Sequence, residues 1–140
     1  MKFARNVFWI AAAYGFLIIV PLYFTAQTVS MNQTPATVHL EYYYSFAGVT
    51  LVWQILFLVI SFDPQRYRAI MILCFLEKLS LVPTFALLAP QGLYPASWIP
   101  ALIIDLALGI LFLFAYSRVR REMLLHDKAA PSGASNPSNH

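Results

Sequence analysis

Residues 67–88 read YRAIMILCFLEKLSLVPTFALL, an apolar run that is interrupted near its middle by Glu77 and Lys78. The run is long enough to cross a bilayer core of about 30 Å, which takes roughly 20 apolar residues in a helix. Charged side chains are costly at that depth and need partners there. The stretch that predicts a transmembrane helix therefore also marks a polar site inside it.

Similar apolar stretches elsewhere predict an all-α fold, an integral membrane four-helix bundle in up-down order. The expected helices cover about Ala4–Phe24, Tyr42–Ser61, Tyr67–Leu88 and Ser97–Ser117, within one domain of residues 1–126. We expect the first helix to stay uncleaved, because its apolar run exceeds the roughly 7–15 residues of a signal peptide core. Residues 127–140 are rich in Ala, Ser, Pro and Asn, which predicts a disordered cytoplasmic tail.

The composition excludes an ordinary soluble domain. Of 140 residues, 60% are hydrophobic and only 11% are charged, whereas soluble domains have roughly 25% charged residues. The net charge of +3 does not indicate nucleic-acid binding, because all Lys and Arg residues except Lys78 lie at segment ends. Cys74 stands alone, and neither a phosphate loop, a nucleophile triad nor a metal-spaced His/Cys set is present. The sequence thus predicts no cofactor and no metal site.

The basic residues alternate between the two sides of the expected membrane. Because Lys and Arg favour the cytoplasmic side, this pattern predicts a multi-pass membrane protein with both termini in the cytoplasm. The residues concerned are Lys2 and Arg5 before the first helix, Arg66 and Arg68 in the middle turn, and Arg118, Arg120, Arg121 and Lys128 after the fourth helix.

Every expected helix places a polar group at a similar depth. At 1.5 Å per residue, Tyr14, Gln54, Glu77, Lys78 and Asp105 all lie about 12–18 Å below the outer helix ends. Lys78 is best placed to pair with Glu77 or with Asp105. One lysine against two carboxylates leaves one acid in excess, and such an acid tends to hold a proton because desolvation disfavours its charged form. This excess acid is the candidate ligand-binding or proton-handling group.

Other features predict how the helices pack. Ala11 and Gly15 form a small-xxx-small pair that permits close helix approach. The short connection between the second and third helices predicts an antiparallel hairpin packed along its length. Pro83 lacks a backbone donor and predicts a kink in the third helix. Trp53 is too deep for an interfacial belt, so packing beside Gln54 is the favoured interpretation.

Several roles fit the polar cluster. The leading hypothesis is a non-enzymatic membrane protein in which Glu77, Lys78 and Asp105 bind a lipophilic or cationic molecule or support assembly with a membrane partner. Gln54 and Tyr14 would then be hydrogen-bonding walls. Alternatives are a network that only fixes helix register, a membrane enzyme that uses an intramembrane carboxylate, a small transporter that works as a homodimer, and Lys78 that snorkels to headgroups without any network.

Two segments carry a resemblance. Residues 41–49, EYYYSFAGV, precede Trp53-Gln54, and residues 63–68, DPQRYR, precede Leu76-Glu77-Lys78. Over about Glu41–Leu88 the chain resembles a group of small uncharacterised bacterial four-helix membrane proteins, which implies an inner-membrane location and no particular activity. In architecture alone it is similar to the DoxX-like membrane proteins, some linked to quinone or thiosulfate chemistry, and to the sterol-isomerase-like group, which places acidic residues in a membrane cavity.

Overall fold

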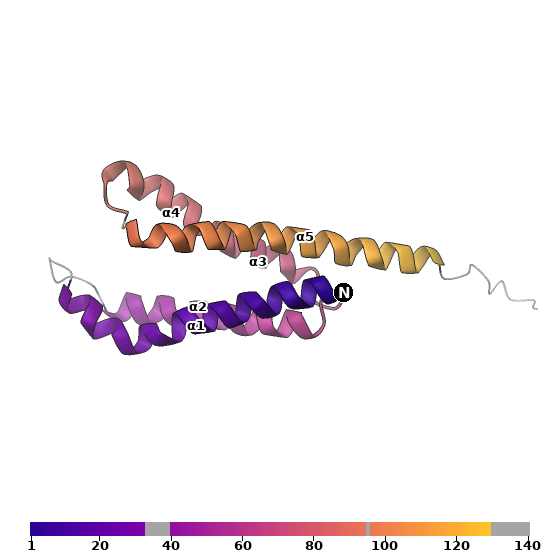
Figure 1. The fold of residues 1–140 in the computed structure, drawn as a ribbon, viewed down its shortest axis with the longest axis horizontal. Helices are drawn as coiled ribbons and strands as arrows, with labels where there is room; N and C mark the ends of the chain where they lie inside the picture. The colour runs from indigo at the N-terminus through magenta and orange to yellow at the C-terminus, as the bar shows by residue number, and fades with distance from the viewer. Residues whose placement is uncertain (33–39, 95, 130–140) are drawn as a thin grey trace, which may run out of the picture.

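The computed structural model describes residues 1–32, 40–94 and 96–129. They form an all-α four-helix bundle, in which one of the long helices is broken (Figure 1). Its elements are α1 (Lys2–Asn32), α2 (Leu40–Phe62), α3 (Ile70–Leu79), α4 (Leu81–Leu88), the 3₁₀ turns η1 (Ala89–Gln91) and η2 (Ala96–Trp98), and α5 (Ile99–Ala129).

Four helical segments are long and apolar enough to cross a membrane: Lys2–Thr25, Leu40–Phe62, Ile70–Gln91 and Ala96–His126. They correspond to the four helices that the sequence predicts. Two helices are longer than predicted, because α1 continues to Asn32 and α5 to Ala129. No Gly or Pro interrupts either extension, so nothing in the local sequence stops the helix. Residues 127–129, which the sequence assigns to the tail, thus belong to α5, and the rest of the predicted tail, residues 130–140, lies outside the described residues.

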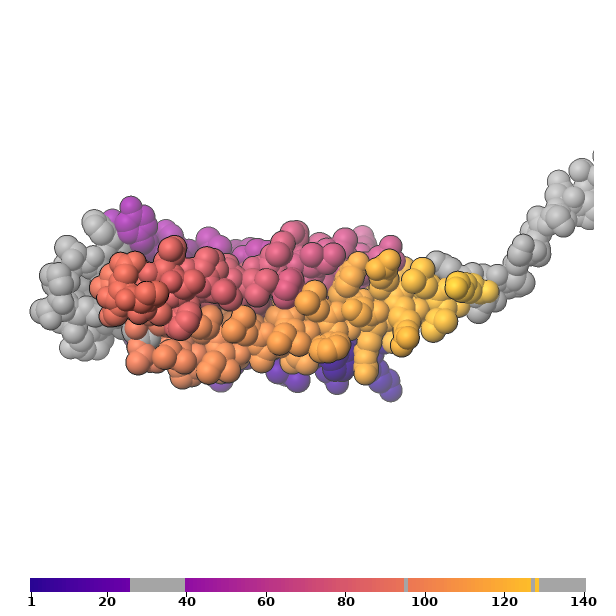
Figure 2. Space-filling view, turned by 90° about the horizontal axis from the view of Figure 1, so that it is seen from above, coloured from indigo at the N-terminus to yellow at the C-terminus, as the bar shows by residue number. Residues whose placement is uncertain are grey.

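The bundle consists of two helix pairs. α1 packs closely on α2, α3 packs on α5, and α1 also contacts α5 and so joins the pairs. Figure 1 shows the two pairs as separate layers, and Figure 2 shows α3 and α4 beside α5, whose last turns project beyond the bundle. The prediction that the second and third helices pack along their length is wrong, since α2 contacts α3 only sparsely. A short turn makes two helices neighbours in sequence without making them packing partners.

The third transmembrane segment is broken at Ser80, between α3 and α4. Pro83 lies in the first turn of α4 and cannot donate a hydrogen bond to the carbonyl of Leu79. The Ser80 N–H instead donates to the Glu77 carbonyl at 3.1 Å, a tighter 3₁₀-type bond. The predicted kink therefore takes the form of a helix break one turn before the proline, directly beyond Glu77 and Lys78.

A hydrophobic core fills the half of the bundle that contains the start of the chain. This half is called the terminal half below. Phe8 on α1 stacks on Phe112 of α5 with ring centroids 4.3 Å apart, and Phe57 on α2 packs edge-on against Phe112 at 5.1 Å. Smaller buried residues surround these rings, namely Ala4, Ala11, Ile60, Met71, Cys74, Ala115 and Val119. This packing closes the terminal half, so the open volume lies in the opposite half.

Candidate functional site

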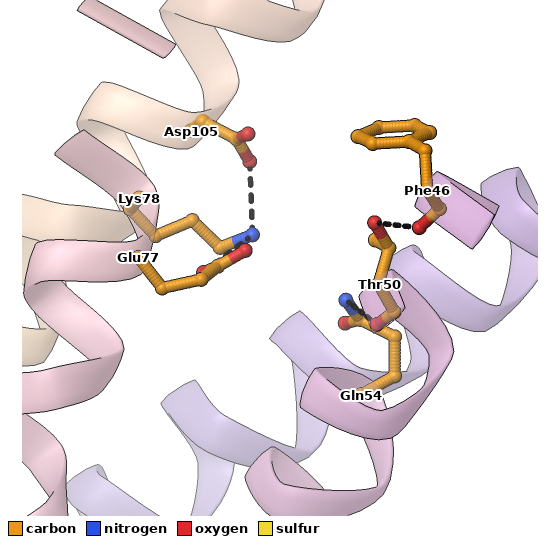
Figure 3. Close-up of polar contacts among 6 residues, drawn as sticks. All are labelled: Phe46, Thr50, Gln54, Glu77, Lys78 and Asp105. Carbon is orange, nitrogen blue, oxygen red and sulfur yellow. Dashed lines mark hydrogen bonds and ion pairs between the residues drawn. The ribbon is translucent and has the colours of Figure 1, made fainter. Parts of the chain in front are cut away.

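Lys78 lies between two carboxylates at the boundary of the two halves (Figure 3). Its Nζ atom is 3.3 Å from Oε2 of Glu77 and 3.2 Å from Oδ1 of Asp105. The contact with Asp105 joins α3 to α5, whereas the contact with Glu77 lies within α3. These three residues are called the triad below.

The surroundings of Lys78 explain how a charge is tolerated at this depth. The side chain retains only 7% of its exposure, and its Nζ lies 5.2 Å from the centroid of the Phe57 ring, a cation–π distance. Gly109 of α5 lies beside Lys78, and a Cβ there would be 3.4 Å from the Lys78 Cβ. A methyl group would just fit at this position, and a larger side chain would press against α3, so a small residue suits the close approach of α5 that brings Asp105 to the ammonium.

A second polar wall faces the triad from α2 (Figure 3). Gln54 is 1% exposed, and its Nε2 donates to the Thr50 carbonyl at 3.1 Å. Thr50 in turn donates its hydroxyl to the Phe46 carbonyl at 2.8 Å. Because the acceptor beside Nε2 fixes which way the amide points, Oε1 is the other end of the group. It is buried without a hydrogen-bond partner among the residues that the structure describes.

Between the two walls lies a cavity of about 470 Å³, within the usual range for small-molecule sites of about 300–1,000 Å³. It runs from the triad toward the end of the bundle where α1 ends and α5 begins. Most of its lining is apolar or aromatic. The lining includes Tyr14, Gly15 and Ile18 of α1, Phe46, Val49, Thr50, Trp53 and Gln54 of α2, Glu77 and Lys78 of α3, Ser97 and Trp98 of η2, and Ala101 and Asp105 of α5.

All five site residues predicted from the sequence line this one cavity. Glu77, Lys78 and Asp105 are joined by ion pairs, whereas Gln54 stands on the opposite wall and Tyr14 contributes from α1. The aromatic lining was not predicted. Trp53 lies beside Gln54 and packs against Phe57, with ring centroids 6.4 Å apart, but it also faces the cavity. Trp98, at a helix start, gave no sequence signal that distinguished it from an interfacial residue.

The chemistry available in the cavity is that of two carboxylates, one ammonium, a phenol and amide and hydroxyl groups. Among the described residues no three His, Cys, Asp or Glu side chains gather as metal ligands would. The arrangement can hold a charge, accept hydrogen bonds and enclose an apolar group of moderate size.

The four long apolar helices of the bundle indicate a small polytopic membrane protein. No protein-family model matches the chain, and neither a curated protein nor a solved structure is similar enough to it to count as a match.

Proposed function

We propose that this protein binds a lipophilic molecule inside the bilayer, with the polar end of that molecule at the triad. The observation that carries the proposal is a cavity of about 470 Å³ that all the packed helices line and that ends on a buried lysine between two partly buried carboxylates. The site residues would be Glu77, Lys78 and Asp105, with Gln54 and Tyr14 on the facing walls.

The unfilled volume distinguishes this role from a purely structural one. Protein interiors pack densely and leave few voids larger than a water molecule. A network that only fixes helix register could be fully enclosed by side chains, as Phe8, Phe57 and Phe112 enclose one another in the terminal half. The triad instead borders a cavity of ligand size, which supports binding.

The cavity also reaches the lipid-facing surface. Phe46 and Val49 of α2 line it while exposing 45% and 62% of their surface. Across from them, α4 packs closely on neither α1 nor α2. A molecule dissolved in the bilayer could therefore enter sideways without crossing the aqueous phase, which supports a lipophilic ligand.

A second candidate role is helix locking, alone or within a larger membrane assembly. The observation that favours it is the ion pair between Lys78 and Asp105, which joins α3 to α5. The two roles are compatible, since a site can be held together by the same groups that bind. They differ in the effect of filling the cavity with a side chain, which would prevent ligand binding but would leave the ion pair in place.

For the orientation we propose an inner membrane with both termini in the cytoplasm. The chain start, the α2–α3 turn and the last turns of α5 lie at the same end of the bundle (Figure 1). The basic residues Lys2, Arg5, Arg66 and Arg68 belong to that end, which supports its placement on the cytoplasmic side.

The test of binding fills the cavity from α5. Ala101 lines the cavity, whereas Ala107 on the same helix is exposed away from it. Native mass spectrometry of the purified protein should show a co-purified lipophilic molecule in the parent and in Ala107→Phe, but not in Ala101→Phe. Equal loading of both variants would reject binding in this cavity, and no adduct in the parent would reject binding altogether; either result would leave the locking role.

A further inference from the structure

The balance of charge in the cavity is uneven. The ionisable side chains that line it are Tyr14, Glu77, Lys78 and Asp105. With the phenol neutral, one ammonium faces two carboxylates, so one negative charge has no counter-ion among the lining residues. In a low-dielectric setting such a charge is relieved by a proton or by a second cation.

Both acids of the triad are more exposed than the lysine between them. The Glu77 and Asp105 side chains are 16% and 19% exposed, while Lys78 is 7% exposed. Each ion pair uses one carboxylate oxygen, Oε2 of Glu77 and Oδ1 of Asp105. Within the described ranges, no hydrogen bond occupies the other oxygen of either acid. Both acids therefore keep acceptor capacity, and their carboxylates face the α2 wall together with the ammonium (Figure 3).

The facing wall offers acceptors as well. Both donors that anchor it are directed at backbone carbonyls, the Gln54 amide at Thr50 and the Thr50 hydroxyl at Phe46. Oε1 of Gln54, an acceptor, is buried on this wall without a hydrogen-bond partner among the described residues. A ligand that donates hydrogen bonds would therefore find acceptors on both walls, whereas on the triad wall a ligand that only accepts them would depend on Lys78, which already pairs with both acids.

The remaining walls suit a cation with an apolar group. Tyr14, Phe46, Trp53 and Trp98 bring aromatic rings to the cavity, and the negative faces of such rings attract cations. Lys78 already uses this attraction at Phe57. Beyond the rings, the exposed parts of Phe46 and Val49 extend an apolar path to the lipid.

We propose that the ligand is a lipophilic monocation, a protonated amine that carries one long or bulky apolar group. Its nitrogen lies against Glu77 and Asp105 and completes the charge balance of the triad, and its apolar group lies along α2 toward the bilayer. This assignment depends on the proposed binding function, which it narrows to one class of ligand.

The experiment compares three probes of equal chain length on the protein in nanodiscs. Dodecylamine carries a donating cation, dodecanol is neutral, and dodecanoate is an anion. Isothermal titration calorimetry, corrected with empty nanodiscs, measures the saturable part of binding. We expect dodecylamine to bind at least about tenfold more tightly than dodecanol, the effect of one charge-assisted hydrogen bond, and dodecanoate to bind most weakly.

A pair of variants locates the preference. Asp105→Asn should reduce the ratio between dodecylamine and dodecanol to about threefold or less, because one carboxylate partner is lost. Glu122→Gln removes an acid from the same helix but outside the cavity lining and should leave the ratio unchanged. The comparison of the three probes on the parent protein stands even if Asp105→Asn does not fold.

The outcomes separate the two proposals. Saturable binding of dodecanol or dodecanoate as tight as that of dodecylamine would overturn the cationic class and leave lipophilic binding intact. An unchanged ratio of dodecylamine to dodecanol affinity in Asp105→Asn would show that the cation does not bind at the triad, and would also overturn the assignment. Saturable binding of none of the probes would reject both the ligand class and the binding function.

Discussion

Gly15 on α1 leaves open the volume that the carboxamide of Gln54 on α2 occupies, since a Cβ at Gly15 would overlap that side chain. The pair explains why α1 packs more closely on α2 than on any other helix. It also holds Gln54 at the cavity wall, where its Nε2 bonds to Thr50. One small residue thus fixes both a helix contact and one side of the candidate site.

Gly15→Ala should therefore destabilise the protein, although alanine is the better helix former. The added methyl group meets the Gln54 amide, and overpacking of this kind costs about 1–3 kcal/mol. Unfolding in mixed micelles, followed by circular dichroism, measures the loss. Gln54→Ala in the same background should recover most of it by removing the overlap. A Gly15→Ala protein as stable as the parent would mean that α1 and α2 are farther apart than described.

Asp105→Asn should weaken the packing of α3 on α5 more than Glu77→Gln does. The Lys78–Asp105 ion pair joins two helices, whereas Glu77 and Lys78 are neighbours on one helix and stay close even when the helices separate. We expect Asp105→Asn to cost about 1–3 kcal/mol, the range for leaving a buried polar group without its partner, and Glu77→Gln clearly less. Micelle unfolding of the two variants under the same conditions gives the order, and the reverse order would contradict this reasoning.

Phe112→Ala should be among the most destabilising single substitutions in the terminal half. The ring contacts Phe8 of α1 and Phe57 of α2 and is fully buried, so its loss opens a cavity between three helices. Such truncations cost about 3–5 kcal/mol in well-packed cores.

The matched control is Phe114→Ala on the same helix, where the ring is 59% exposed and its loss should change stability by less than about 0.5 kcal/mol. The difference in unfolding midpoint between the two variants tests the position of the core. Equal effects would show that the terminal half is not packed around Phe112.

Labelling from outside the cell tests the proposed orientation. In a Cys74→Ser background, Gln91→Cys lies in η1 at the cavity end and Gln65→Cys lies in the α2–α3 turn at the terminal end. A membrane-impermeant maleimide should label Gln91→Cys in intact cells and Gln65→Cys only after the membrane is permeabilised, because basic residues flank Gln65. The opposite pattern would invert the topology.

Much of the fold could be predicted from the sequence because membrane spans follow from length and apolarity alone. The close approach of α1 expected from Ala11 and Gly15 is confirmed, with Ala11 buried and Gly15 against Gln54. The break before Pro83 follows from the missing donor of proline. These features depend on local chemistry, which a single segment of sequence records.

Helix pairing could not be predicted in the same way. The small and polar stripe of α2 contains Ala47 and Gln54, and a stripe of this kind specifies a close contact without naming the helix that makes it. α2 packs mainly against α1, whereas the short turn predicted that it would pack along the third helix. The shared depth of the polar residues predicted that they would lie at one level of the bundle, and they line one cavity. The cavity itself depends on how far the two helix pairs separate, which no local sequence pattern encodes.

Photoaffinity labelling tests the central claim most directly, namely that the cavity above the triad is where a ligand binds. A photoreactive dodecylamine in nanodiscs, with labelled peptides mapped by mass spectrometry, should modify the segments around Trp53 and Trp98, and excess dodecylamine should suppress that labelling. Labelling spread over exposed residues away from the cavity such as Leu17 and Phe114, which are 74% and 59% exposed, with no suppression by competitor, would contradict it.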